Sequence, residues 1–192
     1  MKFLLRYLLL TLAFWLPDSF CAAQNEDIKL IKKRVETGWR ATRADESAVT
    51  AAMAGMNEDG SFKGINYEDL SRTAGYPHRQ HTRDLLYMAK AYKTPASRFY
   101  KNNAVKARIE KGLTYWAKYD FVGDNWHDSQ ISTPTDLTDL MLVIGDELPA
   151  DLVARLQPII GRAHMNASGA RPSGDRIVIA GIVAKNLLFL GD

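Results

Sequence analysis

Cysteine is almost absent from this sequence. Its 192 residues include one, Cys21, which lies near the start of the chain. Residues 24–192 therefore cannot form a disulfide bond, and this excludes the small exported domains that disulfides hold together. A fold without such crosslinks depends on its hydrophobic core.

A strong charge of one sign is also missing. The chain carries 25 basic and 22 acidic residues, a formal net charge of +3, and residues 24–192 keep a charge of only +2. This surplus is too small to indicate a nucleic-acid partner, although it is compatible with a locally basic cleft for an acidic ligand. With 46% hydrophobic and 24% charged residues, the composition is that of a folded domain.

A long hydrophobic run lies at the amino terminus, within "MKFLLRYLLLTLAFWLPDSFCAAQ". Lys2 and Arg6 give it a basic end, and the apolar run at 8–16 is too short to span a bilayer comfortably as a helix. Small residues precede Gln24. These features predict a signal peptide over 1–23, cleaved after Ala23.

A signal peptide implies a secreted or periplasmic protein with no membrane segment after cleavage. The alternative is a lipid anchor at Cys21, but the Asp-Ser-Phe that precedes this cysteine is a poor lipidation motif. We expect residues 24–192 to form one domain and to be monomeric.

Strand patterns are lacking as well, since no pair of alternating segments stands out. Apolar residues instead recur at helical spacing. Trp39 and Trp116 lie on such apolar stripes and are predicted to be core residues. The predicted helices cover 26–41, 45–56, 81–92, 103–119, 132–148, 148–160 and 175–190. Successive helices joined by loops of different length are typical of an array of α/α hairpins.

Several residues suggest where these helices begin and end. Asp45 is a predicted N-cap, Thr133 another with Pro134 at the first helical position, and Asp175 is the predicted N-cap of the last helix. Pro158 should kink or end its helix. The last helix is apolar on nearly all sides, so we expect it to be buried.

The stretch "GDNWHDSQISTPTDL" at 123–137 places Asn125, Trp126 and His127 in a predicted loop before a helix. Trp126 either plugs the core or faces a binding cleft. A metal site from His127, Asp128, His164 and Asp175 is conceivable, but no ligand spacing supports it. We predict neither a metal nor another cofactor.

Four segments carry a resemblance to a known family: "HTRDLLYMAKAY", "LTYWAKYD", "DNWHDSQISTPTDLTDLMLVI" and "PSGDRIVIAGIVAKNLLFL". In this order and spacing they resemble the N-terminal α/α-toroid part of polysaccharide lyase family 8, which contains the chondroitin AC, hyaluronate and xanthan lyases. The resemblance implies an all-α toroid of helical hairpins. Because the chain ends directly after an apolar helix, we expect 24–192 to be an incomplete N-terminal portion.

The resemblance implies that the protein is an exported enzyme, one that cleaves acidic, uronate-containing polysaccharides by β-elimination. Asn125 and Trp126 match the start of the family's Asn-Trp-Trp aromatic patch, and His127 stands where the family has its second Trp. The family's carboxylate-binding Asn falls on Asp175, our candidate catalytic position. Asn125, Trp126, His127 and Arg176 are the candidate substrate-binding residues.

An ionised Asp175 would repel a uronate carboxylate at ~4 Å by roughly 1 to 4 kcal/mol. We therefore expect Asp175 to be protonated, or paired with Arg171, Arg176 or a cation, unless the substrate or the correspondence differs. The family's catalytic His and Tyr fall beyond Asp192, so we expect the chain alone to be inactive.

Two other classes of protein stay open. The first is a non-catalytic carbohydrate-binding helical domain, which the departures at His127 and Asp175 favour. The second is an unrelated α/α-barrel glycosidase, for which Asp128 and Asp175 are the carboxylate pair that could be nominated.

Overall fold

The protein is described from a computed structural model that covers residues 26–38, 44–167, 169–172 and 174–191. The predicted signal peptide and Trp39 lie outside these ranges. Residues 26–38 are helical. The other elements are α2 (Glu46–Gly55), η1 (Arg72–Ala74), α3 (Arg79–Lys93), α4 (Asn103–Tyr119), η2 (Asp128–Ser132), α5 (Thr133–Ile144), η3 (Gly145–Glu147), α6 (Ala150–Ile160) and α7 (Gly174–Leu190). Within the described ranges, β structure is limited to one isolated bridge between Met56 and Phe62. The predicted all-α class is confirmed.

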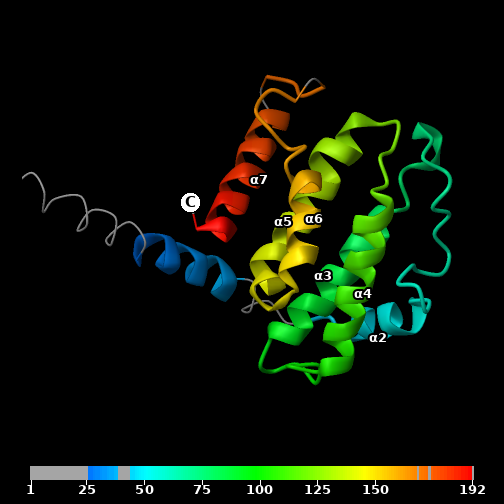
Figure 1. Ribbon diagram of the computed structural model, residues 1–192, viewed down its shortest axis with the longest axis vertical. Helices are drawn as coiled ribbons and strands as arrows, with labels where there is room; N and C mark the ends of the chain where they lie inside the picture. Colours follow the sequence, from blue (N-terminus) through cyan, green and yellow to red (C-terminus); the bar gives the residue numbers. More distant parts are fainter. Residues whose placement is uncertain (1–25, 39–43, 168, 173, 192) are drawn as a thin grey trace, which may run out of the picture.

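Helices α3 and α5 lie side by side and run in the same direction (Figure 1). At their first turns, the Thr82 hydroxyl donates to the Asp136 carboxylate at 2.8 Å. At the other end, Tyr92 and Lys93 of α3 donate to Glu147, just after α5, at 2.8 and 2.7 Å. Side-chain contacts thus fix the register of the two helices at both ends.

Helix α7 extends this layer beyond α5, again in parallel. Lys185 of α7 pairs with Asp139 of α5 at 2.8 Å, and Phe189 approaches Gly145 so closely that a Cβ there would lie 2.5 Å from the ring. Helices α4 and α6 return in the opposite direction and contact each other. The result is a two-layer array of α/α hairpins with the amino ends of α3, α5 and α7 at one end.

The main core lies between these layers, and the predicted apolar faces fill it. The apolar residues that recur at helical spacing on α3 and α4 are buried: Leu85, Met88, Ala89, Tyr92, Val105, Ile109, Leu113 and Trp116. Burial of this kind stabilises the fold by ~25 cal/mol for each Å² of apolar surface removed from water. The prediction that Trp116 is a core residue is confirmed.

The prediction that Thr133 is the N-cap of α5 is wrong, because Thr133 is itself the first residue of that helix. Asp45 caps α2 as expected, its carboxylate accepting the Ala48 N–H at 3.0 Å. Thr133 has helical backbone angles instead, because the π-helical turn η2 leads directly into α5. Its hydroxyl lies 3.3 Å from that of Tyr76. The supposed loop is therefore helical from Trp126 onward.

Pro158 does not interrupt α6 where it stands, since the helix ends two residues later at Ile160.

The amino-terminal helix, 26–38, attaches to the far end of the array. Lys32 pairs with Asp146 at 3.1 Å, and its ammonium lies 5.4 Å from the centre of the Phe189 ring.

The prediction that the last helix is buried is also wrong. Ile177 is 74% exposed and Leu190 54%, whereas the fully covered apolar residues of α7 are Ile179 and Ile182. Only one side of α7 meets α5 and η2. None of the helices in the described part of the chain is both long and apolar enough to cross a membrane.

Candidate functional site

Trp126 lies half-buried at the amino end of the array, against the turn before α7. A Cβ on Gly169 would come within 2.3 Å of the indole ring, so the missing side chain of Gly169 is what lets the ring approach. The ring also packs against a second apolar cluster, formed by Ile131, Ala163, Ala167, Ile179 and Ile182. Trp126 thus contributes to packing, and its role as a sugar platform stays a prediction.

Asn125 and His127 flank this tryptophan. The Asn125 side-chain oxygen accepts the His127 backbone N–H at 3.3 Å, and His127 Nδ1 lies 3.3 Å from the Ser132 hydroxyl. The imidazole meets the Trp126 ring edge-on, with centroids 5.6 Å apart. Both side chains are half-buried. The segment directly before the π-helical turn therefore brings an amide, an indole and an imidazole together as one group.

Asp175 lies in the first turn of α7, which begins at Gly174, so it is not the N-cap that we expected. Its carboxylate points back along the chain and accepts both the backbone N–H and the Nε–H of Arg171 at 3.0 Å. These hydrogen bonds lower the pKa of Asp175, with a smaller contribution from His127. Of the explanations considered for this aspartate, the structure selects an ionised carboxylate paired with Arg171.

The two arginines beside Asp175 have different environments. The Arg171 side chain is 82% exposed even though it is paired with Asp175. Arg176 instead donates to the backbone carbonyl of Met165 in the preceding turn. The candidate residue Arg176 thus stabilises this turn, and Arg171 is the arginine that presents its guanidinium to solvent.

The acidic and histidine residues of this end do not form a metal site. Across the described ranges, no group of three or more His, Cys, Asp or Glu side chains comes together around a common point.

Sequence reasoning missed two features of this end of the array. Gly169 is 43 positions from Trp126 in the chain, so no local pattern signals that the two residues touch. The second feature is the pair of buried histidines. His78 donates its Nε2–H to the Tyr67 carbonyl at 3.1 Å. His81 lies between the Tyr67 hydroxyl at 2.8 Å and the Gly112 carbonyl at 3.0 Å. Both histidines are fully buried, which indicates a structural role.

The class of domain is therefore an array of helical hairpins. Polar and aromatic residues gather at the amino ends of its parallel helices. Residues 22–170 match the polysaccharide lyase family 8 N-terminal alpha-helical domain. The chain therefore belongs to polysaccharide lyase family 8, through that domain.

Individual relatives agree with this assignment. Chondroitinase-AC of Pedobacter heparinus is 27% identical over 129 residues, which make up 67% of this chain and 18% of that protein. A chondroitinase AC lyase structure superposes with a TM-score of 0.77 at 24% identity, covering 86% of this chain and 24% of that one. A Paenibacillus xanthan lyase gives a TM-score of 0.68 at 19% identity, covering 88% of this chain and 18% of that one.

The likeness to the solved structures supports the fold, and the sequence match supports the family. The chain spans 18% of its curated relative and no more than 24% of these solved chains. The fold and family assignments made from the sequence are thus confirmed.

Proposed function

We propose that this chain is the N-terminal helical part of an exported lyase that cleaves uronate-containing polysaccharides, of the chondroitin or hyaluronan type, by β-elimination. The family supports the reaction class, and the names of the relatives support the substrate class. The observation that carries the proposal is the grouping of Asn125, Trp126 and His127 with the Arg171–Asp175 pair: Gly169, just before Arg171, lies against the Trp126 ring, and His127 is close enough to lower the pKa of Asp175. The leader at 1–23 supports export.

The reaction sets a clear electrostatic requirement. A base removes the C5 proton of the uronate, and the C5 electron pair forms the C4–C5 double bond. The C4–O bond breaks, and the leaving oxygen takes its bonding electrons and is protonated by an acid. The C5 proton is weakly acidic while the adjacent carboxylate is ionised, so a hydrogen-bond donor or a cation must stabilise the charge that develops.

In this chain we assign the carboxylate contact to Arg171. Asp175 holds the guanidinium through Nε at 3.0 Å and through Nη2 at 3.4 Å, and the side chain is still 82% exposed, so its remaining N–H groups can reach a ligand. A guanidinium binds carboxylates through paired, charge-assisted hydrogen bonds. An approaching carboxylate meets Arg171 before Asp175, whose own carboxylate is covered. The pairing offsets the repulsion that Asp175 would otherwise exert.

Asn125, Trp126 and His127 would hold the sugar ring beside this arginine. The Trp126 ring offers a plane for stacking, and the amide and the imidazole offer hydrogen bonds to hydroxyl groups. By the resemblance, the family's catalytic His and Tyr lie outside 24–192. The chain alone is therefore expected to bind substrate without eliminating it.

Binding of chondroitin oligosaccharides, measured by calorimetry at low salt, tests the proposal. Trp126→Ala should weaken binding by roughly 1–3 kcal/mol if the ring stacks on a sugar, by analogy with bases stacked on aromatic side chains. Arg171→Gln should weaken it by roughly 10- to 100-fold, since a hydrogen bond to a charged group contributes about 1.5–3 kcal/mol. Arg155→Gln, on the exposed surface of α6, is the charge-matched control.

The absorbance of the unsaturated product, followed with chondroitin and hyaluronan, tests the reaction. Robust turnover by the chain alone would refute the view that further residues are required. Unchanged binding in folded Trp126→Ala would remove this ring from the site.

A non-catalytic carbohydrate-binding domain is the second candidate, because His127 and Asp175 stand where the resemblance puts a Trp and an Asn. To test this candidate, the remaining helical segment of a family member is supplied to the chain. Chondroitin binding without turnover would then favour a non-catalytic carbohydrate-binding domain.

A further inference from the structure

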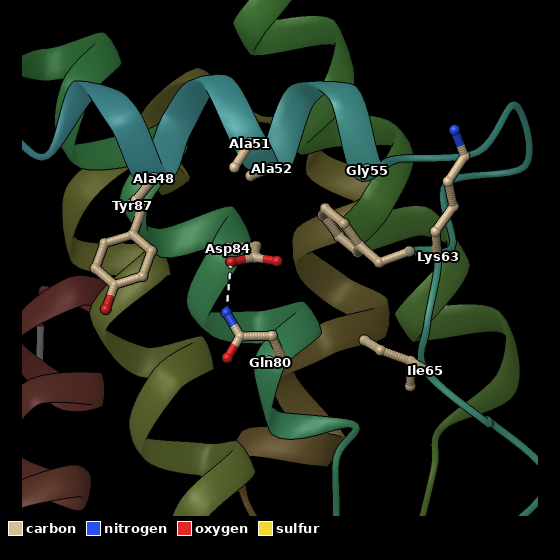
Figure 2. A pocket seen from close by; sticks show the side chains of 10 residues that line it. Ala48, Ala51, Ala52, Gly55, Lys63, Ile65, Gln80, Asp84 and Tyr87 are labelled. Atoms are coloured by element: carbon tan, nitrogen blue, oxygen red, sulfur yellow. Dashed lines mark hydrogen bonds between the residues drawn. The ribbon is translucent and has the colours of Figure 1, made fainter.

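A cavity of about 310 Å³ lies between α2 and α3 (Figure 2). None of the residues that line it belongs to the candidate site at the amino ends of α5 and α7. On one side α2 contributes four residues with little or no side chain, Ala48, Ala51, Ala52 and Gly55. On the other side lie Gln80, Asp84 and Tyr87 of α3.

The space follows from the choice of residues on α2. Val49 and Ala52 of α2 are buried and hold the helix onto the core. The side chains of Ala48 and Ala51 end at Cβ, so they cannot fill the gap that is left beside this contact. Phe62 and Ile65, from the segment after α2, complete an apolar wall.

Asp84 is the unusual feature of this cavity. Figure 2 shows its carboxylate beneath Ala51 and Ala52, with the Gln80 amide donating to it at 2.7 Å. Burial raises the pKa of Asp84 above its ordinary value. Among the described residues, no lysine or arginine lies within ion-pair distance of this carboxylate.

Lys63 lines the same cavity but does not neutralise Asp84. Its ammonium points away from the carboxylate in Figure 2 and lies 3.5 Å from the Ala54 carbonyl, near the carboxyl end of α2. The cavity therefore combines an apolar wall with a half-buried carboxylate that has an amide partner and no cation.

Size and charge restrict the ligand. Pockets for small molecules begin at ~300 Å³, so this one suits a small molecule better than a length of polymer. The carboxylate disfavours an anion. One carboxylate and one amide supply too few oxygen ligands for Ca²⁺, which takes about six to eight. The Tyr87 ring at the rim, 41% exposed, can attract a cation to its face.

We propose that this cavity binds a small organic cation, a primary ammonium group on an apolar stem. Asp84 pairs with the ammonium group, the Gln80 amide keeps the carboxylate in position, and the stem lies against the alanines of α2 and Ile65. The site is independent of the polysaccharide site, and a ligand there neither requires nor reports on the lyase reaction.

This site can be tested by calorimetry or by amide chemical shifts. The probe is n-butylammonium, and 1-butanol is its neutral isostere. The ammonium should bind at least tenfold more tightly than the alcohol. Asp84→Asn should abolish that difference while keeping the shape of the cavity. Glu58→Gln removes a negative charge from an exposed position outside the cavity and should leave binding unchanged.

Ala51→Leu tests the location without touching the charge. This position is exposed on α2, where leucine is a good helix former, and the added side chain should fill the cavity and exclude both probes. Thermal unfolding of each variant verifies the fold, and Ala51→Leu decides the matter if Asp84→Asn fails to fold. Three results would overturn the proposal. The two probes could bind equally, the ammonium could fail to bind, or its binding could survive either substitution.

Discussion

The carboxylate of Asp175 accepts the backbone N–H and the guanidinium Nε–H of Arg171, both at 3.0 Å. One residue thus orders the turn before α7 and fixes an arginine that is otherwise exposed. The aspartate is the inner member of the pair and the arginine the outer one. Within this pair, the positive charge is therefore the one that faces solvent.

Asp175→Asn should destabilise the protein at about pH 7, because the neutral amide loses the ion pair with Arg171. The pKa of Asp175 is lowered in the folded state by its bonds to Arg171. Its stabilising effect is therefore complete above the ordinary aspartate pKa and is lost as the pH falls through the lower, folded-state value. Urea unfolding of wild type and variant should differ at about pH 7 and converge in strong acid. A constant difference across this range would contradict the assignment.

Gly112→Ala should cost about 1–3 kcal/mol of unfolding free energy, although alanine is the better helix former. A Cβ at this position of α4 would lie 2.5 Å from Cδ2 of Leu85, so α3 and α4 could no longer approach as closely. Gly181→Ala in α7 is the matched control, since nothing lies within 4 Å of its added Cβ. That change should stabilise the protein by about 0.5–1 kcal/mol. Thermal or urea unfolding of the two variants should give shifts of opposite sign.

Tyr67→Phe should destabilise the fold by about 1–3 kcal/mol, because two buried groups lose their partner. The Tyr67 hydroxyl accepts the Phe62 N–H at 3.0 Å and lies 2.8 Å from His81 Nδ1. Together these bonds tie the segment after α2 to α3. Tyr100→Phe, at a tyrosine that is 45% exposed, is the control and should change urea unfolding by much less. Equal effects of the two substitutions would rule out the structural role of this hydroxyl.

His81 should make the protein less stable in mild acid. Burial lowers the pKa of this imidazole from 6.5 to about 4, an effect that the bond to the Gly112 carbonyl only partly offsets. Between these values the unfolded chain takes up a proton that the folded protein does not, so stability falls as the pH drops through this window. The loss is roughly 3 kcal/mol in total. NMR titration checks this directly: the His81 ring signals should keep their neutral positions at about pH 5.5, and a midpoint near 6.5 would contradict the assignment.

The sequence by itself determined the helices and the family. Apolar residues at helical spacing identified the inward faces of α3 and α4, and Asp45 marked the start of α2, because such signals depend on neighbours within a few positions along the chain. The ordered set of motifs that pointed to polysaccharide lyase family 8 was also a property of the chain alone.

Only the tertiary structure decided what those residues contact. Local capping rules favoured Thr133 as an N-cap, but the π-helical turn before it leads directly into α5, so Thr133 is helical. Composition predicted a buried α7, yet Ile177 and Leu190 are exposed, because α7 packs against α5 and η2 along one side. Three further features depend on how separate segments pack. They are the pairing of Asp175 with Arg171 instead of Arg176, the approach of Gly169 to Trp126, and the cavity beside Asp84. Packing acts between residues that can be far apart along the chain, so no local pattern carries it.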